Sequence, residues 1–211
     1  MIPINDMRRR YLEARNWNNK AKKMLEETLK WRSTYKPEEI RWHEVTHEGE
    51  IGKFSRANFH DRQGRTVHIM RPGMQDTTSA ENNIRHLVYL LENAILNLSE
   101  GQEQISWLIP LSTSVPIRTA FKVPTRRGWR SLSCINPPRF FEAFYKLFLD
   151  PKIAQKVKFV YPKNKDSVEL MRSYFDVENL PGEFGGNATL KYDHEEFSRL
   201  MAQDDVKTAK F

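Results

Sequence analysis

Residues 60–72 read HDRQGRTVHIMRP, and this stretch decides the class of fold. Gln63-Gly64 predicts a tight turn, because glycine after a polar residue permits the chain to reverse. The residues that follow alternate with the two-residue period of a β-strand, in the order Thr66, Val67, His68, Ile69, Met70. The chain therefore enters a sheet at this point.

Helical and strand patterns alternate downstream of this strand. Apolar residues recur at helical spacing over 84–98: Ile84, Leu87, Val88, Leu91, Ile95 and Leu98. ISWLI at 105–109 is apolar on both faces, which is typical of a strand in a sheet that is covered on both sides. KVKFVY at 156–161 predicts a further strand, and helical patterns occupy 139–150, 165–174 and 193–206. This alternation predicts an α/β fold.

The first 36 residues form a helical part that precedes the sheet. Asn18 can cap a helix whose apolar face contains Ala21, Met24, Leu25, Thr28 and Trp31. Lys36-Pro37 ends this part, because proline cannot continue a helix. We therefore expect a helical N-terminal part over 1–36 and a main domain over 37–211.

Charge and cysteine content narrow the classes of partner and compartment. The 211 residues carry a net charge of +7, with a pI of about 9.5, which favours nucleic acid or an anionic membrane surface as partner. Cys134 is the single cysteine, so no internal disulfide can form, and we expect a cytoplasmic, reducing compartment. The longest apolar tract, 86–98, is too short to cross a bilayer, and we expect no signal peptide.

HEVTH at 43–47 matches the zinc-protease pattern, in which two histidines one helical turn apart bind the metal and a glutamate acts as base. The pattern follows the break at Pro37 and runs at once into Gly49 and Gly52. We therefore interpret His43, Glu44 and His47 as part of a polar connector and expect no metal or cofactor. A zinc metalloprotease stays the less favoured alternative.

TRRGWR at 125–130, with Lys122 nearby, could contact phosphates and stack a base on Trp129, as single-strand binders do. No nucleic-acid-binding motif accompanies it, so we expect no nucleic acid partner, although a basic nucleic-acid-binding protein remains the main alternative. The chain contains no G-x-S-x-G elbow, phosphate-binding glycine loop or paired-carboxylate signature. We therefore expect no enzyme and no catalytic residue.

Two apolar features remain after these motifs. The helical segment 139–150 has almost no polar face, which is typical either of a buried helix or of a lid over an apolar cavity: Phe140, Phe141, Phe144, Tyr145, Leu147, Phe148 and Leu149. In DVENLPGEFGG at 176–186, Leu180 and Phe184 supply apolar anchors beside Pro181 and Gly185-Gly186. We expect this loop to be held against the domain while the chain reverses.

Four blocks taken together resemble the CRAL-TRIO lipid-binding domain family, most closely its plant members similar to the yeast secretory phosphatidylinositol transfer protein: RYLEARNWNNKAKKMLEETLKWR, HDRQGRTVHIMRP, INPPRFFEAFYKLFLDPKIAQKVKFVY and DVENLPGEFGG. The resemblance implies an α/β sheet that floors an apolar pocket for one phospholipid. It also implies a hydrophobic gate helix at about 138–150, lined by Phe140, Phe141, Phe144 and Phe148. The implied function is exchange of phosphatidylinositol or phosphatidylcholine between membranes by a monomer that contacts anionic membranes transiently.

The resemblance also implies residues that contact the lipid headgroup. Arg15 stands at the arginine of the family pattern Leu-x-Ala-Arg, here in YLEAR. Ser112, Thr113 and Ser114 fall near a strand end where the family places hydroxyl groups. Lys163 and Lys165, after KFVY, can meet a phosphate.

Segment 110–135 departs from the family pattern. The family continues after SWLI with a long helix and a hydrophobic strand, whereas this chain has Pro124 and Gly128, which oppose a long helix. SLSCI at 131–135 is a poor core strand by composition. We therefore expect an incomplete sheet that lacks its central strand, as a shifted reading frame or a wrong splice site would produce.

Overall fold

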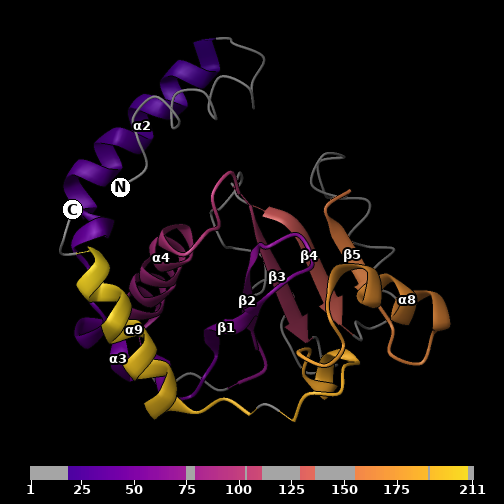
Figure 1. Cartoon of the computed structure of the whole chain (residues 1–211). Helices are drawn as coiled ribbons and strands as arrows, with labels where there is room; N and C mark the ends of the chain where they lie inside the picture. The colour runs from indigo at the N-terminus through magenta and orange to yellow at the C-terminus, as the bar shows by residue number, and fades with distance from the viewer. Residues whose placement is uncertain are drawn as a thin grey trace.

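The computed structural model describes residues 19–74, 79–102, 104–110, 129–135, 155–189 and 191–208. Figure 1 shows its elements, which are in chain order α2 (Asn19–Tyr35), the short 3-10 helix η1 (Pro37–Glu39), α3 (Trp42–Gly49), β1 (Phe54–His60), β2 (Thr66–Met70), α4 (Ala80–Leu96), β3 (Ile105–Pro110), β4 (Trp129–Ile135), β5 (Val157–Val160), α8 (Lys165–Tyr174), the 3-10 helix η2 (Gly182–Phe184) and α9 (His194–Thr208).

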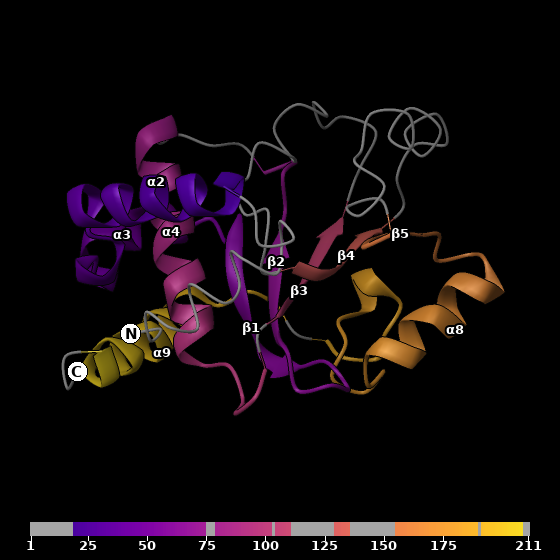
Figure 2. The ribbon, with the colours of Figure 1, turned by 90° about the horizontal axis from the view of Figure 1, so that it is seen from above.

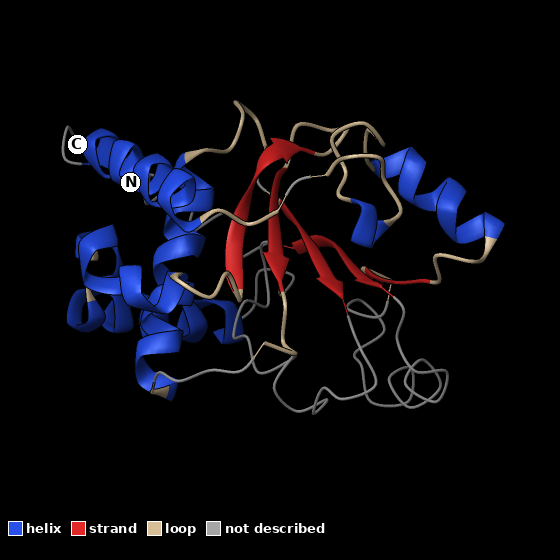
Figure 3. Ribbon diagram, turned by 90° about the horizontal axis from the view of Figure 1, so that it is seen from below, coloured by secondary structure: helices blue, strands red, loops and turns tan. Residues whose placement is uncertain are grey.

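The five strands form one sheet, which Figure 3 shows with helices beside it. The order of the strands in the sheet, β1-β2-β3-β4-β5, is also their order along the chain. β1 pairs with β2 in the antiparallel sense, and β2 to β5 are parallel. Parallel neighbours require crossover connections, and α4 supplies the one between β2 and β3. The α/β class expected from the sequence is confirmed, as are the strands predicted around 66–70, 105–109 and 156–161.

One face of the sheet packs against α8 and η2, and we call it the α8 face. It consists of Val67, Ile69, Leu108, Ile135 and Val160, which pack against Met171, Phe175, Leu180 and Phe184. Residues paired across parallel strands share a face, so Ile69 and Leu108 are neighbours, as are Ile135 and Val160. This cluster joins β2 to β5 to the C-terminal half of the chain.

A helical layer lies beside β1, at the opposite end of the sheet from α8 (Figure 2). Here α3 packs against α4 and α9, and α4 also contacts β1. Its buried core contains seven apolar residues: Ile40, Trp42, Val45, Tyr89, Leu90, Phe197 and Met201. The molecule therefore has two apolar cores, one at each end of the sheet.

Helix α2 differs from the expectation for its apolar face. Trp31 was predicted to lie on that face, but it is 42% exposed and stacks on Tyr35 with ring centroids 5.1 Å apart. Arg32 fixes the C-terminal end of the helix, because both of its terminal nitrogens lie 2.8 Å from the Glu92 carboxylate on α4. The helix is therefore attached to the domain near its C-terminal end.

The expected loss of the central strand is wrong. Residues 129–135 form β4, which pairs with β3 on one side and with β5 on the other. Ser133 and Ile135 are 1% and 2% exposed, so a small polar residue occupies an interior position of the sheet. Residues 129–135 form a strand despite their composition, because the neighbouring strands on both sides supply backbone hydrogen-bond partners.

The loop 176–188 is held as the sequence indicated. Leu180 and Phe184 are buried at 0% and 1% exposure in the core of the α8 face. Gly185 has a φ of 87°, in the left-handed region that glycine tolerates. A Cβ on Gly186 would lie 1.9 Å from the Leu180 carbonyl oxygen, so only glycine fits there. The chain therefore reverses with its apolar side chains buried.

Candidate functional site

The face of the sheet opposite the α8 face is built from large side chains, and we call it the floor face. On β2 and β3 it consists of Thr66, His68, Met70, Ile105, Trp107 and Ile109, each at most 5% exposed. Among the described elements α4 borders this face beside β1, and no described helix lies over its β3–β5 part (Figure 2). The floor face is therefore an apolar surface with one imidazole in it.

His68 is that imidazole, and it is neutral at physiological pH. Burial lowers its pKa to about 3, with smaller contributions from the charge of Arg56 and from His86. Its ring lies edge-on to Trp107 at a centroid distance of 5.0 Å. Nε2 of His68 makes no hydrogen bond to any residue that the structure describes. The floor face thus offers one uncharged polar group to whatever lies against it.

A buried ion pair closes the β1 end of the floor face. Arg56, which pairs with His68 across β1 and β2, places a guanidinium nitrogen 2.7 Å from the Asp204 carboxylate on α9. Asn93 on α4 and Asn97, which follows the last residue of α4, donate to the same carboxylate at 3.0 and 2.9 Å. Burial raises the pKa of Asp204, but hydrogen bonds from Lys207 and Asn93 and the charge of Arg56 outweigh it and hold the pKa below its usual value. We call this group the Asp204 cluster.

Most of the predicted lipid contacts lie outside the described residues. This holds for the headgroup residues Arg15, Ser112, Thr113 and Ser114, and for the gate residues Phe140, Phe141, Phe144 and Phe148. Their roles stay predictions. β3, which precedes the three hydroxyl residues, ends at Pro110, at the edge of the sheet where β2, β4 and β5 also end.

Lys163 and Lys165 are described, and both are exposed. They follow β5, on either side of Asn164, whose side chain caps α8 by accepting from the Ser167 N–H at 3.1 Å. Lys165 is the first residue of α8. Neither lysine makes contact with the floor residues His68 or Trp107 through any interaction that the structure records.

The HEVTH pattern lies on a helix rather than in the connector that we expected, because Trp42–Gly49 forms α3. The face with Val45 is buried, whereas His43 and His47 are exposed. Nδ1 of His47 lies 3.2 Å from the Glu50 carboxylate, which raises the pKa of His47. Within the described ranges no three His, Cys, Asp or Glu side chains are grouped to hold a metal ion.

Glu44, the base of the zinc-protease hypothesis, is already engaged in the structure. Its carboxylate accepts the backbone N–H of Arg41 at 2.8 Å, which caps α3, and it forms an ion pair with Arg85 on α4. The first interaction stabilises the start of α3, and the second joins α3 to α4. The pattern therefore has a structural explanation, and nothing in this geometry supports the metalloprotease alternative.

Sequence reasoning did not find His68, Trp107 or the Asp204 cluster as parts of the site. The signal for the first two was present, since ISWLI is apolar on both faces and TVHIM places His68 and Met70 on the face opposite Val67 and Ile69. No local signal indicates the ion pair, because Arg56 and Asp204 are 148 residues apart in the chain. In the part of the chain that is described, no helix is long and apolar enough to cross a membrane.

Comparison of the sequence with protein families gives one match. The model of the CRAL/TRIO domain matches residues 50–118 and 128–186, and it omits 119–127, inside the segment where the family pattern is interrupted. The match includes β1 to β5, α4, α8 and η2. It thus covers both faces of the sheet and the loop 176–186.

Three curated proteins are similar over most of this chain. A CRAL-TRIO domain-containing protein of Schizosaccharomyces pombe is 30% identical, over 89% of this chain and 19% of its own length. The phosphatidylinositol transfer protein PDR17 of Saccharomyces cerevisiae is 29% identical, over 96% of this chain and 63% of its own. Patellin-5 of Arabidopsis thaliana is 24% identical, over 94% and 33%. The chain thus spans less than two thirds of each of these relatives.

The fold also has a counterpart among solved structures. The crystal structure of Sfh5 superimposes with a TM-score of 0.64 at 14% sequence identity, over 97% of this chain and 79% of that one. At this identity the likeness concerns the fold alone. It agrees with the α/β sheet and flanking helices described above.

Proposed function

Because the chain belongs to the CRAL/TRIO domain family, we propose that it binds one phospholipid on the floor face and exchanges it between membranes. The observation that carries the proposal is the floor face itself, a buried apolar surface over whose β3–β5 part no described helix lies. Each methylene removed from water contributes about 0.8 kcal/mol, so acyl chains leave a bilayer only for such a surface. The name of PDR17 supports phosphatidylinositol as one ligand, and we propose phosphatidylcholine as a second.

We propose the predicted residues in the following roles. The segment 139–150 covers the acyl chains as a gate, and Arg15 pairs with the headgroup phosphate, since a guanidinium binds phosphate bidentately. Ser112, Thr113 and Ser114 donate hydrogen bonds to the headgroup. His68 donates or accepts one bond at an ester of the lipid, because its buried Nε2 has no described partner. No covalent bond is made or broken, and no cofactor is required.

Native mass spectrometry of the protein purified from cells tests the binding. We expect one phospholipid per chain, and transfer of labelled phosphatidylinositol between vesicles in proportion to the protein added. A protein that carries no lipid and transfers none, although it is folded, would contradict the proposal.

Two isoleucines on opposite faces provide a matched pair for locating the lipid. Ile109 lies on the floor face and Ile69 on the α8 face, at 2% and 6% exposure. Truncation of either to alanine costs about 2–5 kcal/mol of folding stability. We expect only Ile109→Ala to weaken lipid retention, and equal retention in the two variants would place the lipid elsewhere.

Headgroup selection has its own test at Arg15. We expect Arg15→Ala to reduce loading of phosphatidylinositol more than loading of phosphatidylcholine. The exposed Lys22→Ala on α2 serves as the charge-matched control. Equal loss of both lipids, or loss of neither, would exclude Arg15 from the headgroup site.

A further inference from the structure

The outer edge of β5 and the start of α8 carry a cluster of lysines, which we call the β5 lysines: Lys156, Lys158, Lys163 and Lys165. Lys156 immediately precedes β5 and Lys158 lies in the strand, whereas Lys163 and Lys165 lie on either side of the α8 N-cap residue Asn164. Lys163 and Lys165 are exposed and Lys156 and Lys158 are half-buried. β5 is the last strand of the sheet, so it has a neighbour on one side only in the described residues.

Within the part of the chain that the structure describes, these lysines have no hydrogen-bond or ion-pair partner. None of the four makes a hydrogen bond or an ion pair with a described residue, although Asp166 and Glu169 lie in the same segment. Residues 155–175 contain five Lys or Arg and two Asp or Glu, which is an excess of three positive charges in a chain whose net charge is +7. The segment 155–175 therefore carries a local excess of positive charge.

Folding stability does not explain all four. Lysine on an edge strand opposes pairing with other chains, which accounts for Lys156 and Lys158. Lys165, however, is the first residue of a helix, where the helix dipole disfavours a cation. A residue that lowers local stability and has no described contact to compensate for it indicates a role in binding rather than in folding.

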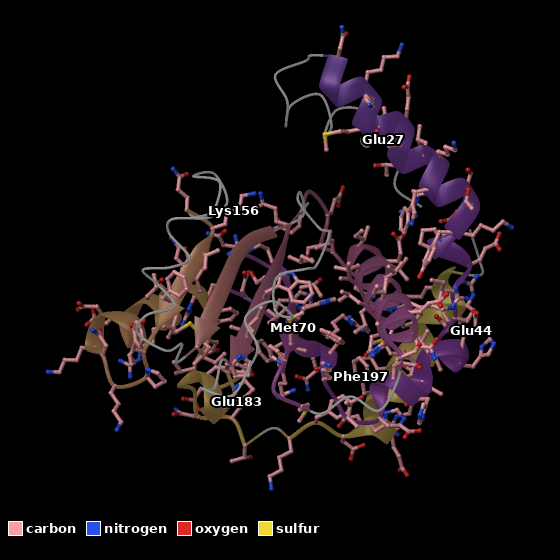
Figure 4. All side chains as sticks on the ribbon, turned by 180° about the vertical axis from the view of Figure 1, so that it is seen from behind. Glu27, Glu44, Met70, Lys156, Glu183 and Phe197 are labelled. Atoms are coloured by element: carbon pink, nitrogen blue, oxygen red, sulfur yellow. The ribbon has the colours of Figure 1, made fainter. Side chains whose placement is uncertain are left out.

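The position of the lysines fits contact with a surface rather than with a bound headgroup. Figure 4 shows Lys156 at the β5 end of the molecule, across the sheet from Phe197 and Glu44 in the helical layer. Lys158 and Val160 share the α8 face, because each pairs with a β4 residue on that face. The β5 lysines therefore belong to the β5 end of the molecule, and Lys158 lies on the α8 face rather than on the floor face.

We propose that the β5 lysines are the surface by which the protein docks on anionic bilayers. The proposal rests on the proposed lipid exchange, because a transfer protein must meet a membrane with one particular side. A lysine near an anionic leaflet contributes about a fivefold gain in affinity, and the attraction fades within the screening length of the salt. Docking through these lysines turns β5 toward the membrane.

Vesicle flotation tests the proposal with the full chain. The probes are phosphatidylcholine vesicles with and without phosphatidylserine, at low and at physiological salt. We expect Lys163→Gln/Lys165→Gln to lower affinity for the anionic vesicles about thirtyfold, and replacement of all four lysines by Gln to lower it several hundredfold. Binding to the neutral vesicles should be weak and unchanged.

A double variant of α2, Lys22→Gln/Lys23→Gln, removes the same net charge from exposed lysines elsewhere. Equal loss of vesicle binding in this control would overturn the proposal, because net charge alone would then explain it. Tighter binding of single-stranded RNA than of anionic vesicles, lost in the β5 variants, would overturn it in favour of a nucleic acid partner.

Native mass spectrometry of the same variants separates docking from lipid loading. We expect the β5 variants to retain their phospholipid. Loss of the lipid would overturn the docking role and support a headgroup contact by Lys163 and Lys165. If the wild type carries no lipid, the proposed function fails, whereas the vesicle comparison still decides whether the β5 lysines bind an anionic surface.

Discussion

Asp204→Ala is expected to destabilise the protein more than any surface substitution, because the Asp204 cluster holds α9 to the rest of the fold. The carboxylate is 1% exposed and accepts hydrogen bonds from Arg56, Asn93, Asn97 and Lys207. These donors come from β1, α4 and α9 itself. Truncation therefore removes the common acceptor of three elements.

The magnitude follows from the burial of each donor. The side chain of Arg56 is 8% exposed, and loss of its counter-ion leaves a buried cation, which costs about 3–5 kcal/mol. Lys207 is 56% exposed and can turn to water, so it adds little. For a chain of this size, 3–5 kcal/mol lowers the melting temperature by roughly 6–20 °C.

Urea unfolding followed by circular dichroism measures the change in the free energy of unfolding. Gln203→Ala, at the neighbouring exposed position of α9, is the control and should change stability by no more than about 0.5 kcal/mol. The double variant Arg56→Met/Asp204→Leu should recover most of the loss, because it removes both charges. A loss below about 1 kcal/mol in Asp204→Ala, or no recovery in the double variant, would refute the reasoning.

Three further predictions concern the loop, the floor face and α3. Gly186→Ala should destabilise the protein by about 1–3 kcal/mol or more, since its Cβ would meet a carbonyl oxygen at 1.9 Å, whereas Gly182→Ala, with 4.0 Å of room, should be nearly neutral in thermal melts. Below pH 6.5 His68 becomes protonated in the unfolded chain but stays neutral in the folded protein. The free energy of unfolding should therefore fall by about 1.4 kcal/mol for each unit by which the pH is lowered from 6.5 to about 3. Urea titrations of His68→Gln should lack this part of the pH dependence, and an identical dependence would contradict the assignment. The double variant His43→Gln/His47→Gln should leave lipid retention unchanged. Stoichiometric zinc that the wild type binds and the double variant does not would revive the metalloprotease alternative.

The sequence predicted elements well where periodicity was strong and failed where partners decide the structure. TVHIM and ISWLI carry an apolar pattern of their own, and both are strands. SLSCI does not, since Ser131 and Ser133 alternate with larger residues, yet it forms β4 because both β3 and β5 supply backbone partners. The interior position of Ser133 follows from the register between β4 and its neighbours, and a short stretch of sequence does not reveal that register.

The site shows the same division between local and distant information. The apolar composition of the floor face could be predicted, because strands apolar on both faces need cover on both sides. The Asp204 cluster could not be predicted, because it depends on how α9 returns to β1 and α4 at the end of the chain. Trp31 shows the reverse case, since helical spacing predicted its burial, yet its side chain is 42% exposed although the neighbouring Arg32 attaches this end of the helix to α4.

The order of the strands has a consequence for biosynthesis. Since β1 to β5 are neighbours in the same order in which they are translated, each strand can join the growing sheet as it leaves the ribosome, and none has to insert between two strands already paired. The helical layer, in contrast, cannot be completed in the order of translation. Trp42 at the start of α3 donates its backbone N–H to the Asp205 carboxylate, and the guanidinium of Arg56 on β1 donates to Asp204. Both elements are therefore joined to α9 only after α9 has been made. A nascent chain stalled before α9 would hold a formed sheet beside an open helical layer.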